Sequence, residues 1–211
     1  MKKAVLFDFW GTLVQQGAYS PLKQTYRMMR PRMHFGEFVE QFERVAMTKP
    51  YDDQMQMFRD AFDAMGLRAQ DWVIEQLVGI WNKNKPLAQP YPETIETLEM
   101  LKKKGVKIAI VSNTPKLSVD GVLEKFGFDK LFDAVCFSYD TGYLKTDPEM
   151  FELALEKLGV AKKDAVMVGD SMETDIAGAE NAGVTAVLID RKGTREYKNK
   201  IKSLVEIEKF L

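Results

Sequence analysis

The chain has 211 residues, which suits a single domain or a core domain with a smaller insert. Its 45% hydrophobic and 29% charged residues are enough for a packed core and exclude a disordered chain. The 30 basic and 31 acidic residues leave a net charge of -1, so the composition argues against nucleic acid and against a membrane surface as partners.

The cysteine content and the apolar runs bear on the cellular compartment. The single cysteine, Cys136, cannot form an internal disulfide, which is compatible with a reducing cytoplasm. The apolar stretch near the N-terminus breaks at Asp8, too early for a signal peptide. No apolar run approaches the roughly 18 residues that a membrane span needs. We therefore expect a cytoplasmic protein.

Short apolar runs that end in polar or glycine-rich sequence predict buried strands, at residues 4–7, 106–111, 134–137, 165–168 and 184–189. Helical patterns with proline or an N-cap residue at the start and glycine at the end follow the later runs, at residues 92–104, 115–126, 148–158 and 174–182. Strands that alternate with helices indicate an α/β fold with a doubly wound, Rossmann-like parallel sheet.

Residues 15–86 interrupt this alternation. The segment lacks a convincing buried strand and predicts amphipathic helices at residues 21–30, 36–48, 52–65 and 70–84. We interpret it as an all-helical cap domain, with residues 1–14 and 87–211 forming the α/β core. Because the loop after the first strand lies at the ligand-binding edge of such a sheet, the cap is expected to cover that edge.

Reactive side chains follow the predicted strands or open the following helices, at Asp8, Ser112, Asn113, Lys145, Asp170 and Asp175. Carboxylates that converge without cysteine or histidine suit a hard cation such as Mg²⁺. A hydroxyl, backbone N–H groups and a lysine suit a phosphoryl group, which a carboxylate can attack at phosphorus. Aspartates are also common turn and N-cap residues, but that explanation accounts poorly for the whole ordered set.

Four segments carry a resemblance to a known family. They are Asp8–Leu13 (DFWGTL), Val111–Thr114 (VSNT), Gly142–Pro148 (GYLKTDP) and Gly169–Asp175 (GDSMETD). Their order and spacing resemble the haloacid dehalogenase-like superfamily of hydrolases, and the helical insert is similar to the C1-type cap of that family. The likeness covers the chain outside the insert.

The resemblance implies a role for each matching position. Asp8 would attack phosphorus, while Ser112 and Lys145 would assist catalysis and bind the phosphoryl group. The other implied substrate-binding residues are Gly11, Thr12 and Asn113. Mg²⁺ would be held by Asp8, Asp170, Asp175 and the backbone carbonyl of Trp10. The substrate would be a small phosphorylated molecule, and the protein a monomer or a homodimer.

One position departs from the family pattern. Trp10 stands where phosphatases of the family usually carry a second aspartate, whose acid/base role is worth roughly 10²–10⁴-fold in rate. The alternatives are a 2-haloacid dehalogenase that attacks carbon without a metal, a phosphonate-cleaving enzyme that uses a cap lysine, and a weakly active or silent binding protein. Since dehalogenases usually lack the acidic ligand that Asp170 supplies, we favour a Mg²⁺-dependent phosphohydrolase that forms an aspartyl-phosphate.

Other polar residues are secondary candidates. His34, the one histidine, is a conceivable substitute acid, although we interpret it as a linker residue. The cap arginines Arg27, Arg30 and Arg32 are interpreted as a solvated helix face. Residues 190–193 are interpreted as a surface turn.

Overall fold

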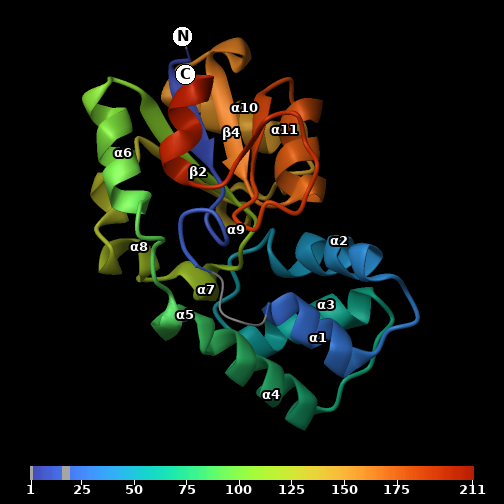
Figure 1. The fold of residues 1–211 in the computed structure, drawn as a ribbon. Helices are drawn as coiled ribbons and strands as arrows, with labels where there is room; N and C mark the ends of the chain where they lie inside the picture. The colour runs from blue at the N-terminus through green and yellow to red at the C-terminus, as the bar shows by residue number, and fades with distance from the viewer. Residues whose placement is uncertain (1, 16–19) are drawn as a thin grey trace.

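The computed structural model describes residues 2–15 and 20–211. Its centre is a six-stranded sheet in the order β3-β2-β1-β4-β5-β6, in which all neighbours are parallel (Figure 1). The strands are β1 (Ala4–Phe7), β2 (Lys107–Ser112), β3 (Ala134–Phe137), β4 (Ala165–Gly169), β5 (Thr185–Ile189) and β6 (Lys200–Ile201). The predicted fold class and the predicted strands are confirmed. The strand β6, which has only two residues, was not predicted from the sequence.

Helical segments cover both faces of the sheet (Figure 1). In the core these are α5 (Asn84–Leu87), α6 (Thr94–Lys103), α7 (Lys116–Val119), α8 (Val122–Lys125), η1 (Phe128–Lys130), α9 (Ser138–Thr141), α10 (Pro148–Leu158), η2 (Lys162–Asp164), η3 (Met172–Ile176), α11 (Ala177–Asn181) and η4 (Leu204–Phe210). Val5 and Phe7 pack on the α6 side, whereas Ala4 and Leu6 pack on the α10 side. This alternation explains why each strand is apolar at nearly every position.

Two predicted core helices differ in detail. The helix predicted at 115–126 is divided into α7 and α8, because Gly121 between them has φ 73°, which a continuing helix does not accommodate. The helix predicted at 174–182 begins earlier, as the π-helical turn η3, and continues as α11. Such π-helical turns are frequent at functional sites.

The helices α1 (Pro21–Met29), α2 (Phe35–Ala46), α3 (Gln54–Ala64) and α4 (Asp71–Asn82) lie beyond the carboxyl ends of the strands (Figure 1). The four helices predicted for this segment are confirmed to within two residues at each end. Their apolar faces form a separate hydrophobic cluster that includes Phe38, Phe42, Met57, Phe58, Phe62, Ile74, Leu77 and Trp81. We call α1 to α4 the cap; the domain bounds of 15–86 and of 1–14 with 87–211 stay a prediction.

The cap is seated on the core by polar contacts. Arg44 of α2 makes two hydrogen bonds to the Asp147 carboxylate, at 2.5 and 2.8 Å. Lys116 at the start of α7 contacts the Asp52 carboxylate of the cap at 2.5 Å. Leu144 of the core is buried in the hydrophobic cluster of the cap. These contacts hold α2 over the edge of the sheet where the strands end.

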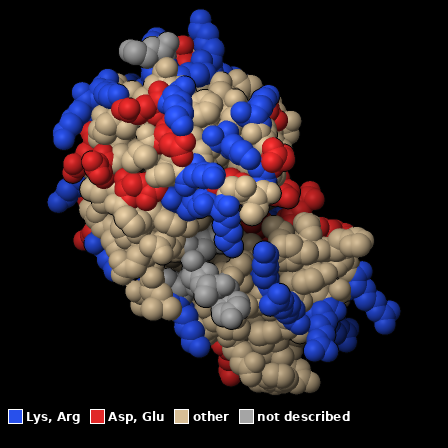
Figure 2. Space-filling view, in the orientation of Figure 1, with Lys and Arg blue, Asp and Glu red and all other residues tan. Residues whose placement is uncertain are grey.

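The surface agrees with the balanced composition. Over the core part of the face seen in Figure 2, Lys and Arg side chains are interspersed with Asp and Glu. Among the described residues, no helix combines the length and the apolar character needed to cross a bilayer.

Candidate active site

Asp8 follows β1 at the centre of the sheet, beside β4, where the order of the strands reverses. In sheets of this kind, ligands bind at this position. The Asp8 side chain is buried, and its Oδ1 accepts hydrogen bonds from Ser112 Oγ at 3.1 Å and from Lys145 Nζ at 2.6 Å. The sequence places the three residues far apart, and the fold brings them into direct contact.

Lys145 joins two carboxylates. Its Nζ lies 2.6 Å from Asp8 Oδ1 and 2.5 Å from Asp175 Oδ1, and only 4% of the side chain is exposed. Burial by itself would lower the pKa of Lys145, but the charges of Asp175 and Asp8 outweigh it and raise the pKa above its ordinary value. Lys145 therefore remains a fixed cation beside Asp8 at physiological pH.

A cluster of three carboxylates surrounds this lysine. Asp8, Asp170 and Asp175 each place an oxygen within 4.8 Å of the other two. Burial and the neighbouring charge of Asp8 raise the pKa of Asp170 to about 7, and burial raises that of Asp175 to about 6. Crowded carboxylates of this kind repel one another, and a divalent cation with oxygen ligands relieves that repulsion. The donor set therefore fits Mg²⁺.

Glycines and a tight turn make room for the cluster. A Cβ atom at Gly11 would lie 2.4 Å from Asp170 Oδ2, and one at Gly169 would lie 2.2 Å from the Asp175 carboxylate. The backbone N–H of Ser171 donates to Asp175 Oδ2 at 2.9 Å, which fixes the orientation of that carboxylate at η3. Larger residues at either glycine would displace a carboxylate of the cluster.

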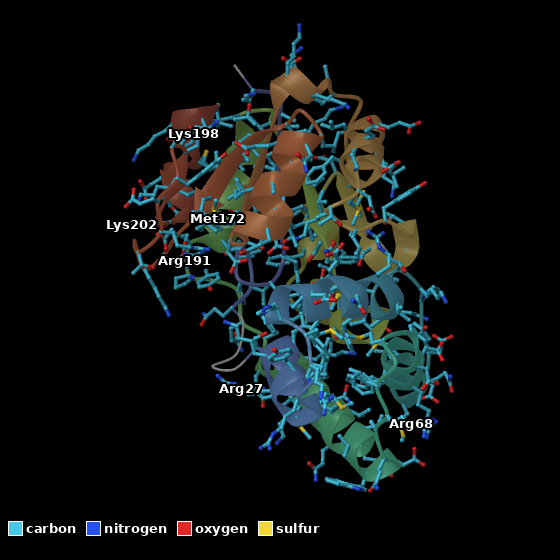
Figure 3. The ribbon with its side chains drawn as sticks, turned by 90° about the vertical axis from the view of Figure 1, so that its right-hand side faces the viewer. Arg27, Arg68, Met172, Arg191, Lys198 and Lys202 are labelled. Atoms are coloured by element: carbon cyan, nitrogen blue, oxygen red, sulfur yellow. The ribbon has the colours of Figure 1, made fainter. Side chains whose placement is uncertain are left out.

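The loop after Asp8 is held from the opposite end of the chain. Arg191 donates to the Thr12 carbonyl oxygen at 2.9 Å and to Glu93 at 2.5 Å, and its guanidinium stacks on the Tyr91 ring at 3.4 Å. Figure 3 shows Arg191 on the core. Residues 190–193 form a turn, as predicted, but the sequence did not reveal that its arginine anchors this loop.

The sequence model of the family described as haloacid dehalogenase-like hydrolase matches residues 2–183. The chain belongs to the haloacid dehalogenase-like hydrolases. The match includes all the residues of the carboxylate cluster.

Individual relatives differ in how much of the chain they share. The glyceraldehyde 3-phosphate phosphatase of Methanothermobacter thermautotrophicus is 34% identical over 54% of this chain and 51% of its own, so the chain spans about half of that relative. A HAD phosphatase from Thermococcus onnurineus is 31% identical with a TM-score of 0.64, over 99% of this chain and 97% of the other. The 2-haloacid dehalogenase of Pseudomonas syringae pv. Tomato DC3000 shares the fold. It is 22% identical, with a TM-score of 0.66 over 99% of this chain and 97% of the other.

In this haloacid dehalogenase-like hydrolase, Trp10 points its indole toward the second motif. The indole Nε1 donates to Thr114 Oγ1 at 3.3 Å, and the ring meets the Phe9 ring edge-on at 5.0 Å. The position two residues after Asp8 therefore presents an aromatic ring to the cavity where an acid/base aspartate was expected for a phosphatase. The contact of the Trp10 carbonyl with a metal stays a prediction.

The phosphate contacts predicted for Gly11 and Thr12 stay predictions as well. The Gly11 N–H donates to the Val14 carbonyl oxygen at 2.7 Å, so this amide is used within its own turn. The role that the structure shows for Gly11 is to leave space for the Asp170 side chain.

Asn113 connects the core to a cap residue that sequence reasoning missed. Its Oδ1 accepts from the Lys145 backbone N–H at 2.8 Å, and its Nδ2 donates to Glu43 Oε2 at 2.8 Å. Glu43 is a buried carboxylate on α2. The sequence pattern that could have indicated Glu43 is its helical spacing, because it lies one turn from both Val39 and Met47 and so shares a face with them. The other buried side chains of this helix are apolar.

A cavity of about 930 Å³ separates the cap from the ends of the strands. Core residues Asp8, Ser112, Lys145 and Asp170 line one side, and Phe35, Val39, Glu43, Met47 and Trp81 line the cap side. Among the described residues, the lining does not include His34, Arg27, Arg30 or Arg32, all four of which are exposed. Figure 3 shows Arg27 projecting outward from α1, which agrees with a solvated helix face.

Proposed function

We propose that this protein is a Mg²⁺-dependent phosphohydrolase that acts on a small phosphorylated metabolite through an aspartyl-phosphate. The observation that carries the proposal is the surroundings of Asp8, whose carboxylate accepts from Ser112 and Lys145 and lies within 4.8 Å of two further carboxylates. A buried carboxylate beside a fixed cation and a hydroxyl is arranged for nucleophilic attack on an anionic phosphoryl group.

Each residue has a part in this reaction. Asp8 attacks phosphorus, Ser112 Oγ donates to a phosphoryl oxygen, and Lys145 Nζ balances the charge of the nucleophile and of the phosphoryl group. Mg²⁺ would be held by Asp8, Asp170, Asp175 and the carbonyl of residue 10, and when bound it supplies positive charge to the phosphoryl oxygens. Asn113 positions the Lys145 loop through its hydrogen bond to the backbone.

The carboxylate cluster also favours attack at phosphorus over attack at carbon. A dehalogenase that attacks carbon needs no metal, whereas three carboxylate oxygens this close together suit the cation that the proposed phosphatase requires. The relative from Methanothermobacter thermautotrophicus and the one from Thermococcus onnurineus are both named phosphatases. The dehalogenase at 22% identity supports only the fold.

The lining of the cavity suggests the class of ester. Its described cations are Lys23 and Lys145, and Lys145 is already paired with two carboxylates. The cap side is otherwise largely apolar or acidic, through residues such as Phe35, Met47 and Glu40. We therefore propose a monophosphate ester of a neutral alcohol as the substrate class, in preference to a bisphosphate.

The test is a phosphatase screen with Mg²⁺ or with EDTA, run beside chloride release from 2-chloropropionate. We expect turnover of p-nitrophenyl phosphate with Mg²⁺ only. Asp8→Asn should abolish it with the fold intact by circular dichroism, while Asp129→Asn, at an exposed aspartate in η1, should retain it. Full activity of Asp8→Asn would exclude this nucleophile. Chloride release in EDTA would establish the dehalogenase, and no turnover on any substrate would indicate a silent scaffold.

A further inference from the structure

The proposed reaction requires two proton transfers that Trp10 cannot perform. The alcohol oxygen needs a proton as it leaves phosphorus, and the water that later attacks the aspartyl-phosphate must lose one. An indole N–H neither ionises usefully at neutral pH nor points to spare acceptors here, since it donates to Thr114. Another group that faces the cavity around Asp8 must therefore carry the proton.

Glu43 is placed for this task by the cap. It lies on the same side of α2 as Val39 and Met47, one turn from each, and all three line the cavity that also contains Asp8 and Lys145. Its carboxylate is held by Asn113 through Oε2, the one oxygen for which a hydrogen bond is described. The exposed fraction of Glu43 is 8%, so the group is enclosed between cap and core.

The charges around Glu43 suit proton transfer at neutral pH. Burial is the main effect and raises its pKa to about 7, while the Asn113 hydrogen bond and the charge of Lys145 oppose this rise and the charges of Asp175 and Asp8 add to it. A pKa near the working pH gives both the acid and the base form appreciable populations. Along α2, the charged neighbours Glu40 and Arg44 are exposed or paired with Asp147.

We propose that Glu43 of the cap is the general acid/base that replaces the aspartate missing at position 10. This inference rests on the proposed phosphohydrolase function. It also makes the cap a part of the catalytic machinery, because Glu43 lines the cavity that contains Asp8 and its helix α2 is seated on the core through Arg44 and Asn113.

The two chemical steps balance with Glu43 as the only proton carrier. First, an Asp8 oxygen bonds to phosphorus while the bond from phosphorus to the ester oxygen breaks, and that oxygen keeps the electron pair, takes the Glu43 proton and leaves as the alcohol. Next, a water oxygen attacks the aspartyl-phosphate as the Glu43 carboxylate takes a proton from it. The bond to Asp8 then breaks with its pair returning to the Asp8 carboxylate, and phosphate is released.

The experiment compares Glu43→Gln with Glu37→Gln, an equal change of charge at an exposed position of the same helix. Glutamine keeps an acceptor for Asn113 but cannot carry the proton. Each variant is tested with p-nitrophenyl phosphate, whose leaving group needs no proton, and with glycerol phosphate, whose leaving group does. For Glu43→Gln we expect a loss of roughly 10²–10⁴-fold in kcat/KM for glycerol phosphate. With p-nitrophenyl phosphate we expect a burst of about one equivalent of p-nitrophenolate followed by slow turnover, because the second step still needs a base.

The outcomes separate this proposal from the proposed function. In one outcome, the unmodified protein is active, Asp8→Asn is inactive, and Glu43→Gln keeps the ratio of kcat/KM for the two substrates and shows no burst. Glu43 is then not the acid/base, and the proposed phosphohydrolase function stands. If the unmodified protein hydrolyses neither substrate, both fail. Should Glu43→Gln fold poorly, the pH profile of kcat/KM of the unmodified protein decides. A decrease of kcat/KM at alkaline pH with glycerol phosphate, but not with p-nitrophenyl phosphate, supports Glu43 as the general acid. Identical pH profiles for the two substrates overturn the proposal.

Discussion

The side-chain amide of Asn113 spans the junction between core and cap, donating to Glu43 Oε2 at 2.8 Å while its carbonyl oxygen accepts from the Lys145 N–H at the same distance. One core residue thus fixes both the loop that carries the cation beside Asp8 and a buried carboxylate of the cap. The seating of the cap and the geometry of the phosphoryl site are therefore linked through one side chain.

Replacing Asn113 tests this link. Asn113→Ala leaves Glu43 without its donor, which should cost about 1–3 kcal/mol of unfolding free energy. In a double-mutant cycle with Glu43→Ala, urea denaturation should give a coupling energy of roughly 0.5–3 kcal/mol. The same cycle with Glu37→Ala is the control and should be additive, and additivity in both cycles would show that the contact contributes nothing.

Restoring the aspartate that the family pattern lacks should change the choice of substrate. Trp10→Asp places a carboxyl group two residues after Asp8, so turnover of glycerol phosphate should rise relative to p-nitrophenyl phosphate. The same change in a Glu43→Gln background should recover part of the lost activity, because either carboxyl group can carry the proton. The measurement is the ratio of kcat/KM for the two substrates, and an unchanged ratio in both backgrounds would contradict our interpretation of Trp10.

Burial of Glu43 should make stability depend on pH. Its folded pKa of about 7 exceeds the ordinary value of 4.5, so between these values the folded protein keeps a proton that the unfolded chain has lost. The contribution of Glu43 to stability is therefore greatest below pH 4.5 and declines as pH rises to 7. Glu43→Gln cannot titrate, so relative to the unmodified protein its stability should rise by on the order of 3 kcal/mol across this window.

Urea denaturation in EDTA at pH 5 and pH 8 measures this difference. Asp170 and Asp175 titrate in both proteins, so their own contributions are present on both sides of the comparison. Glu37→Gln, which removes a carboxylate at an exposed position of the same helix, is the control. A constant difference for Glu43→Gln would mean that this carboxyl group titrates normally.

Removal of Mg²⁺ should lower stability through the carboxylate cluster. A ligand at one hundred times its Kd adds about 2.7 kcal/mol to the folded state, so Tm should be a few degrees higher in Mg²⁺ than in EDTA. Asp170→Asn removes a ligand oxygen from the cluster and should abolish this difference, whereas Asp129→Asn should preserve it. A difference in Tm that survives in Asp170→Asn would place the bound cation elsewhere.

The sequence by itself determined the parallel sheet and the residues at its edge. Strands such as β1 and β4 are buried on both faces, so they appear as continuous apolar runs, and the next residues, Asp8 and Asp170, must lie at their carboxyl ends. Parallel neighbours bring such ends together, which is why the carboxylate cluster could be predicted without coordinates. The departure at Trp10 was equally visible, because it depends only on counting two residues from Asp8.

Only the tertiary structure decided what faces that edge. Helical spacing groups Glu43 with Val39 and Met47, but it does not say whether that row faces solvent, the interior of the cap or the core. The seating of α2, through contacts such as Asn113 with Glu43, settles this over a separation of 70 residues. Likewise, Arg191 reaches Thr12 from the opposite end of the chain. Long-range packing of this kind depends on the whole fold, and no local pattern records it.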